Sequence, residues 1–100
     1  MATVSKALFR GAAATSSTTL YTVPSSTTAV VTNIVVTNTA SSGATFDILL
    51  DDVALANDVS VAANSITAID LKQVLAQNKT IKGLASAVTV TFHISGVEIA

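Results

Sequence analysis

The stretch TAVVTNIVVTNT, residues 28–39, holds the longest run of strand-forming residues in the chain and decides the fold class. Valine, isoleucine and threonine are stiff about χ1 and fit a pleated strand better than a helix. The two faces of such a strand carry Val30, Ile34 and Val36 on one side and Val31 and Val35 on the other. A half-exposed strand should alternate apolar and polar residues, so a strand that is apolar on both faces needs a cover on its outer face. We expect that cover to be another segment of the chain or another subunit.

The clearest alternation in the chain is AVTVTFHISGV, residues 87–97. Its apolar face carries four residues that we expect in the core, Val88, Val90, Phe92 and Ile94. Other strand signals recur about every ten residues, with Ser, Thr, Asn, Asp and Gly between them. The remaining strands are predicted at residues 4–10, 18–23, 46–50, 53–55, 58–62, 65–71 and 81–84.

These signals predict an all-β fold, a single antiparallel β-sandwich or jelly roll of about eight short strands. One hundred residues suit one domain, so residues 1–100 are expected to form a single sandwich, with an N-terminal arm plus the first strand in residues 1–17. Helical spacing occurs at Leu71, Val74 and Leu75, which predicts one helical turn over residues 72–77.

Charge and composition argue against several classes of function. The net charge is −1 and the five cations are scattered, whereas a nucleic-acid interface needs a basic patch. No apolar run approaches the roughly 18 residues that a membrane-spanning helix needs. The chain has no cysteine, which fits a reducing cytoplasm and leaves no disulfide or thiolate metal site. We therefore expect neither nucleic acid nor a membrane among its partners.

No constellation of residues points to catalysis. An active site needs a positioned acid, base or nucleophile with a partner, and the single histidine, His93, has no second histidine or cysteine beside it. We expect His93 to face solvent or an interface, and we expect no enzyme activity, no catalytic residue, no cofactor and no metal site. Four aspartates lack the spacing of an EF-hand loop, and whether they bind a cation stays open: Asp47, Asp51, Asp52 and Asp58.

Apolar surface should remain after the core is filled, because half of the residues are hydrophobic and only 11% are charged. Burial against a partner is the expected use of this surface. The candidate assembly contacts are Leu8 and Phe9 of the N-terminal arm and Val31 and Val35 of the long strand. A sugar-binding platform is less favoured, because such platforms use exposed aromatic rings and the chain has only four aromatic residues.

Several short segments keep a recognisable order and spacing along the chain. They are Leu20–Pro24 leading into the strand to Thr39, then Ile69–Leu71 with Val74–Leu75, and finally Thr80–Gly83 with Ser95–Ile99. This layout resembles small virion proteins of tailed bacteriophages, and the resemblance covers the chain from about Leu8 to Ile99. Many relatives carry glycine where this chain has Asp52, and another near Asn78, which are departures that affect turn type rather than fold.

The resemblance implies a β-sandwich without catalytic residues that assembles on a particle, either on the capsid shell or on the tail. Our first expectation is a capsid decoration protein that sits where capsomers meet and stabilises the shell by binding its assembled state. It would be made in the cytoplasm of a bacterial host and act in the virion as a homo-oligomer, with a trimer among the options. Its partner would be the major capsid or tail protein. The alternatives are a minor tail or fibre-base protein and, in another class, a carbohydrate-binding module for host attachment.

Overall fold

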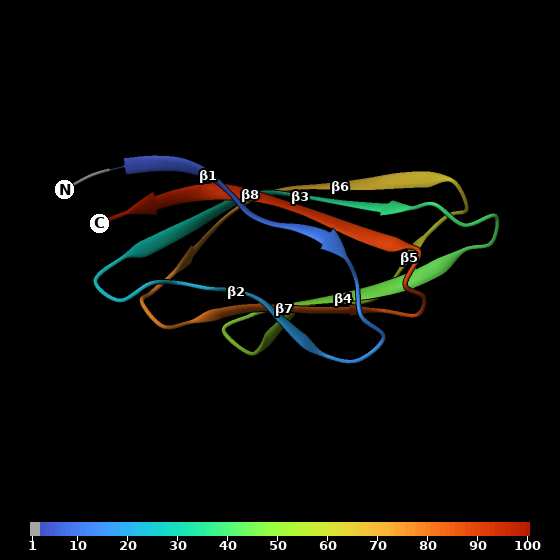
Figure 1. The fold of residues 1–100 in the computed structure, drawn as a ribbon, viewed down its shortest axis with the longest axis horizontal. Helices are drawn as coiled ribbons and strands as arrows, with labels where there is room; N and C mark the ends of the chain where they lie inside the picture. The colour runs from blue at the N-terminus through green and yellow to red at the C-terminus, as the bar shows by residue number, and fades with distance from the viewer. Residues whose placement is uncertain (1–2) are drawn as a thin grey trace.

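Eight β-strands and no helix make up the computed structural model, which describes residues 3–100 (Figure 1). The strands are β1 (Thr3–Ala12), β2 (Thr18–Thr22), β3 (Thr28–Asn38), β4 (Ala44–Leu50), β5 (Val53–Val61), β6 (Ser65–Leu75), β7 (Thr80–Ala85) and β8 (Val90–Ile99). The all-β prediction is confirmed. Residues 1–2 of the expected N-terminal arm lie outside the described residues, and most of the rest of that segment is β1.

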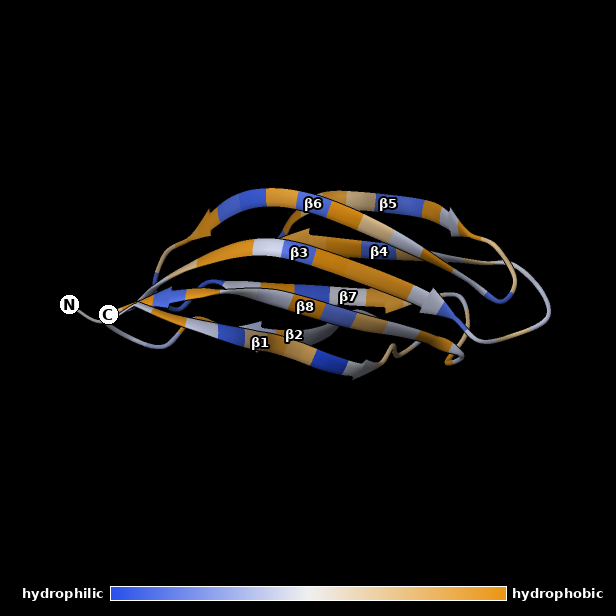
Figure 2. Cartoon of the chain, turned by 90° about the horizontal axis from the view of Figure 1, so that it is seen from above, coloured by the Kyte–Doolittle hydropathy of each residue, from blue (hydrophilic) through white to orange (hydrophobic). Residues whose placement is uncertain are grey.

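The strands form two antiparallel four-stranded sheets that pack face to face (Figures 1 and 2). Sheet A has the order β1-β8-β3-β6 and sheet B the order β2-β7-β4-β5. Consecutive strands lie in opposite sheets, except for β4 and β5, which form a hairpin. Strands β1 and β6 are the edges of sheet A, and β2 and β5 are the edges of sheet B. The chain is therefore a β-sandwich, as its strand pattern predicts.

Apolar side chains from both sheets fill one core between them. Phe46 of β4 and Phe92 of β8 are fully buried and meet edge to face, with ring centroids 6.1 Å apart. The other large side chains that are fully buried are the polar Asn38 and nine branched aliphatic residues, namely Val23, Val31, Ile34, Val36, Ile48, Val61, Ile81, Val90 and Ile94. β-branched residues pack well on a pleated surface, which explains why a chain this rich in valine and isoleucine can close a core with few aromatic rings.

Strand β3 contains a β-bulge at Thr32. The pairing register of β3 shifts between Val31 and Asn33 against both of its neighbours. The Thr32 hydroxyl donates to the carbonyl oxygen of Ser95 on β8 at 3.3 Å. A bulge inserts one residue into a strand, so the inward and outward alternation changes phase where it occurs.

The phase change corrects the predicted faces of β3. The buried positions of this strand are Ala29, Val31, Ile34, Val36 and Asn38. Val30 and Val35 are half-buried and lie between these inward positions, on the outer face. The grouping of Val30 with Ile34, and of Val31 with Val35, is wrong because it assumed unbroken alternation.

Two further predictions, about strands β6 and β8 of sheet A, are wrong. Strand β6 continues to Leu75, which is buried and pairs with Ala29, so the expected helical turn at residues 72–77 is absent. Strand β8 begins at Val90, after a turn in which the Val90 amide donates to the carbonyl oxygen of Ala87 at 3.3 Å. Val88 lies in that turn and is 64% exposed, so it is not a core residue.

One strand replaces two in sheet B. The predicted strands at residues 53–55 and 58–62 are the single strand β5, Val53–Val61, which keeps pairing with β4 through two register shifts. Asp58 has a φ of 51° within it. Its amide donates to Asp47 Oδ1 at 2.9 Å, which holds this irregular position in place.

The tight turns use aspartate and asparagine where the backbone is left-handed. Asp51 and Asp52 have φ values of 54° and 60° and connect β4 to β5, as the sequence predicts. Asn64 and Asn78 have φ values of 51° and 67° in the turns before β6 and β7. Short polar side chains tolerate this conformation better than other non-glycine residues do. Positions 52 and 78 thus accept the same backbone that a glycine would adopt most easily.

Candidate protein-binding surface

The outer face of sheet A carries a row of three valines that crosses three strands. Val97 of β8 pairs with Val30 of β3, which in turn pairs with Val74 of β6. Residues directly opposite each other on antiparallel strands project to the same face, with Cβ atoms about 5 Å apart. Val74 is 69% exposed and the other two are half-buried. The row is therefore a continuous apolar strip on the outside of the molecule.

A second row lies further along the same face. It runs from Arg10 of β1 through His93 of β8 and Val35 of β3 to Ala68 of β6. Near the end of the sheet, Ile66 of β6 is 65% exposed beside threonines of β3 and β8. Small, apolar and hydroxyl side chains thus cover most of this face.

Charges on this face lie at the edges of sheet A. Arg10 stands on edge strand β1, and Asp70 and Lys72 stand on edge strand β6. Asp70 Oδ1 accepts a hydrogen bond of 3.2 Å from Asn33 Nδ2. Because desolvating a charge is costly, a face whose centre is free of lysine, arginine and carboxylates is suited to burial against another protein.

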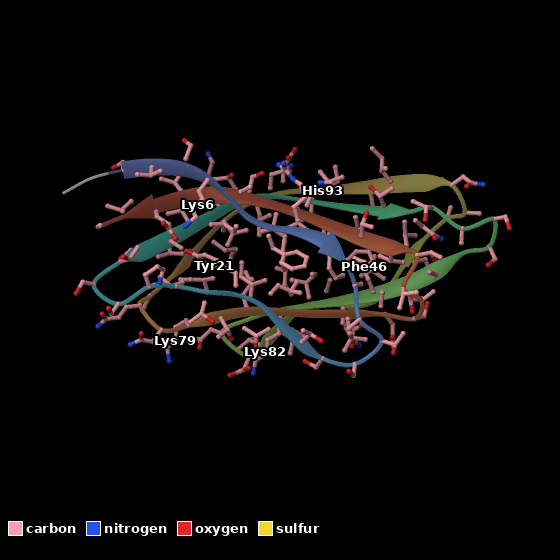
Figure 3. The ribbon with its side chains drawn as sticks, in the orientation of Figure 1. Lys6, Tyr21, Phe46, Lys79, Lys82 and His93 are labelled. Carbon is pink, nitrogen blue, oxygen red and sulfur yellow. The ribbon has the colours of Figure 1, made fainter. Side chains whose placement is uncertain are left out.

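The outer face of sheet B is more highly charged. Leu49 of β4 pairs with Lys82 of β7, and Asp47 of β4 pairs with Leu84 of β7, so each outward leucine has a charge beside it. Lys82 Nζ lies 2.6 Å from Asp52 Oδ1. Figure 3 shows Lys79 and Lys82 on the outer side of sheet B. Burial of this face would strip water from several charges, so it is the poorer candidate for a dry contact.

His93 lies on the outer face of sheet A, as predicted. It pairs with Arg10 on one side and Val35 on the other, and it is half-buried there (Figure 3). Within residues 3–100, no three side chains of the histidine, cysteine, aspartate and glutamate types come together in a way that could hold a metal ion. The same residues form no helix that is long and apolar enough to cross a membrane.

Three of the four aspartates singled out in the sequence have partners for their carboxylates. Asp51 Oδ1 lies 3.6 Å from Lys79 Nζ, and Asp52 forms the short ion pair with Lys82. Asp47 accepts the hydrogen bond from the Asp58 amide. These contacts tie the β4–β5 turn to β7 and hold the irregular part of β5, so each carboxylate except that of Asp58 has a structural role.

Three of the four candidate assembly contacts belong to the core or pack against it, and one lies on the outer face. Leu8 is 7% exposed and Val31 is fully buried, so both belong to the core of this chain. Phe9 is half-buried and packs against the core, where its ring lies over Gly11. Val35 is the one of the four that points to the outer face of sheet A.

Sequence reasoning missed the companions of Val35 on that face. Val30, Val74 and Val97 come from three strands, and they meet only because β3 lies between β8 and β6. Only Val97 sits in a clearly alternating segment, in phase with His93 and Ser95, which gives a signal for an outward valine. Val30 lies in an apolar run, and Val74 lies in a segment with helical spacing. Their common row depends on the register between strands, which the sequence does not display.

A polar cluster joins the two sheets near the end of β8. The Tyr21 hydroxyl of β2 donates to Glu98 Oε2 of β8, and Lys6 Nζ of β1 lies 3.3 Å from Glu98 Oε1 (Figure 3). The hydrogen bond from Tyr21, and secondarily the charge of Lys6, hold the pKa of Glu98 below its ordinary value. Burial and the adjacent carboxylate raise the pKa of Tyr21. The cluster therefore links β1, β2 and β8.

A hollow of about 640 Å³ lies between the end of β5 and the start of β6. Its lining residues are Gly43, Ala44, Thr45, Ser60, Val61, Ala62, Ser65, Ile66 and Thr67. None of these has an aromatic ring or a charge. The hollow therefore has no surface on which a sugar ring could stack.

Comparison with known proteins finds similar solved structures, two of which are described below. No protein-family model matches the chain, and no curated protein matches it. Both solved structures are of a pentameric capsid protein isolated from metagenomic phage sequences, at 20% and 19% identity, with TM-scores of 0.41 and 0.39. Each alignment covers 96% of this chain, and 60% and 59% of the solved chains. The chain thus spans about three fifths of the length of those proteins.

Proposed function

We propose that this chain is a non-enzymatic structural protein of a phage virion, and that it binds other virion subunits through the outer face of sheet A. The observation that carries the proposal is the row Val97, Val30 and Val74, with Val35 in a parallel row. The charged residues of this face stand on edge strands, so its centre can be buried without desolvating a lysine, arginine or carboxylate.

The apolar face is small, so each copy should bind weakly and rely on many repeated contacts. Complete burial of a valine side chain contributes about 1.5–3 kcal/mol, and half-buried residues such as Val30 and Val35 gain only part of that. A few such residues give a weak contact for one copy. On a particle that offers many equivalent sites, copies that contact each other as well as the shell gain avidity from the combined contacts.

Within this class, a capsid decoration protein is the assignment we favour. The resemblance of the sequence to small virion proteins of tailed phages supports it, as does a compact sandwich with an apolar outer face. The strand orders β1-β8-β3-β6 and β2-β7-β4-β5 support a jelly roll, the two-sheet arrangement of two Greek keys that is frequent in capsid proteins. A homo-oligomer bound to the major capsid protein fits this assignment.

Binding to separated particles tests the proposal. The purified chain is mixed with heads and with tails of the phage that encodes it, each prepared without this protein, and bound chain is measured after sedimentation. Saturable binding to heads, with greater resistance of the heads to heat or low salt, supports a decoration protein. Binding to tails alone supports the minor tail or fibre-base alternative. Binding to neither contradicts a virion role.

A further inference from the structure

Strand β6 is a long edge strand that carries exposed apolar side chains. It runs for 11 residues and pairs only with β3. Ile66 and Val74 of β6, together with Val53 and Leu55 of the neighbouring edge strand β5, make up four of the six large hydrophobic residues that are exposed within residues 3–100. A long edge strand with apolar residues is a template for pairing with another strand.

The charges on β6 are arranged to match a second copy of the same strand. Asp70 and Lys72 are exposed and flank Leu71, which is half-buried and packs against the core. If two β6 strands pair antiparallel about a two-fold axis at Leu71, each Asp70 stands opposite Lys72 of the second copy. Opposite charges in directly facing positions stabilise a strand pair, and the symmetry makes this pair twice.

The same register also matches the other side chains of β6. Ala68 stands opposite Val74 of the second copy on the outer face, and the two Leu71 side chains meet on the inner face. A register centred one residue earlier places the two Asp70 carboxylates opposite each other, which is unfavourable. The alternation of exposed and half-buried residues continues from Ile69 to Lys72, although the pairing with β3 shifts beside Thr32.

The other three edges are less suited to such a pair. Strand β1 carries Lys6 and Arg10, two cations that would face each other in a symmetric pair centred between them. Strand β2 is only five residues long. Strand β5 is broken by the left-handed backbone at Asp58, and its pairing with β4 shifts register twice, whereas the pairing of β6 with β3 shifts once. Irregularities of this kind protect an edge from strand pairing.

We propose that two copies of this chain associate through β6, antiparallel about a two-fold axis at Leu71, so that two A sheets become one eight-stranded sheet. The contact lies at the edge of sheet A and goes beyond the proposed function, which uses the outer face. It also extends that face, because the outer surfaces of the two copies become continuous. The partner on this edge is a second copy of this chain.

Charge exchange between Asp70 and Lys72 tests the register. Asp70→Lys and Lys72→Asp each place like charges opposite each other, so each should weaken the dimer about tenfold in sedimentation equilibrium. The double variant Asp70→Lys/Lys72→Asp restores both pairs and should return the dimer close to wild-type affinity. Arg10→Asp, on the opposite edge, is the matched control and should leave the dimer unchanged. A monomeric wild type, or a double variant as weak as the single ones, would overturn the proposal.

Cysteine cross-linking gives an independent readout, since the chain has no cysteine of its own. Leu71→Cys places two thiols opposite each other at the axis, within the Cα separation of about 4.4–6.8 Å that a disulfide needs. Val74→Cys faces Ala68 of the second copy and is the control. Mild oxidation should cross-link the Leu71 variant more completely, although Val74 is the more exposed position. Stronger cross-linking at position 74 would contradict the register. This outcome is independent of whether the chain binds phage particles, which tests the proposed function.

Discussion

Tyr21 of sheet B donates its hydroxyl hydrogen bond to Glu98 of sheet A, so one side-chain contact joins the two layers of the sandwich beside the end of β8. The carboxylate also faces Lys6 of β1, the edge strand of its own sheet. Glu98 is mostly covered, with 16% of its side chain exposed. In this partly dry position a hydrogen bond to an ionised carboxylate is stronger than one between neutral groups.

This contact gives a prediction about pH. The pKa of Glu98 is lower in the folded chain than its ordinary value of 4.5, so the unfolded chain binds more protons in acid. The stabilisation is complete above pH 4.5 and is lost as the pH falls through the folded pKa. Tyr21→Phe removes the hydrogen bond and should reduce the free energy of unfolding by about 1–2 kcal/mol at pH 7. Urea unfolding should show this difference shrinking below pH 4; a constant difference would contradict the role of Glu98.

The edge-to-face pair of Phe46 and Phe92 gives a prediction about the core. Both rings are fully buried. Phe92→Ala leaves a cavity between the sheets and should cost about 3–5 kcal/mol, a large part of the stability of a 100-residue domain. Chemical denaturation measures the change. A midpoint equal to that of the wild type would show that Phe92 is not at the centre of the core.

Gly96 of β8 leaves no room for a side chain between the backbone of β3 and Leu8 of β1. A Cβ atom on residue 96 would collide with the carbonyl oxygen of Val30 and with Leu8. Because the carbonyl is backbone and cannot turn away, Gly96→Ala should destabilise the fold by about 1–3 kcal/mol. Gly43→Ala is the control, since the nearest atom to its Cβ position is 3.7 Å away. Thermal unfolding should separate the two; equal melting temperatures would mean that the strands can shift apart.

The bulge at Thr32 gives a prediction about neighbouring valines. Val31 is fully buried, and Val35 is half-buried on the outer face. Val31→Asp places a carboxylate in the core and should unfold the domain, whereas Val35→Asp should leave it folded with a loss of about 1 kcal/mol or less. Circular dichroism and a melting curve check both variants. The opposite order of stability would place the phase change elsewhere in β3.

The strand content of this chain could be predicted because its strands are built mainly from residues that favour the β conformation. Valine, isoleucine and threonine mark most of the strands, and short runs of Asp, Asn, Ser and Gly mark the turns. The polar outward side chain of His93 and the buried ring of Phe92 follow from simple alternation in β8. Local patterns were sufficient wherever a strand is regular.

Where a strand is irregular, the same reasoning failed. The bulge at Thr32 depends on pairing with β8 and β6 and has no local signature, so Val31 was assigned to the wrong face. Leu71, Val74 and Leu75 have helical spacing, yet pairing with β3 keeps this segment extended. The candidate surface depends on strand order and register. The sequence alone therefore predicted Val35 as a surface contact but not the row Val97, Val30 and Val74.

The most direct test of the account compares binding by two double variants that change opposite faces of the sandwich. Val30→Asp/Val35→Asp places two carboxylates on the outer face of sheet A, and Leu49→Asp/Leu84→Asp does the same on sheet B. All four residues are half-buried, so the pairs are matched in burial, and both proteins should keep a wild-type circular dichroism spectrum. In co-sedimentation with phage particles that lack the protein, we expect the sheet A variant to bind at least about tenfold more weakly and the sheet B variant to bind as wild type does. Wild-type binding by the folded sheet A variant, or an equal loss in both, would contradict the assignment of the outer face of sheet A as the docking surface.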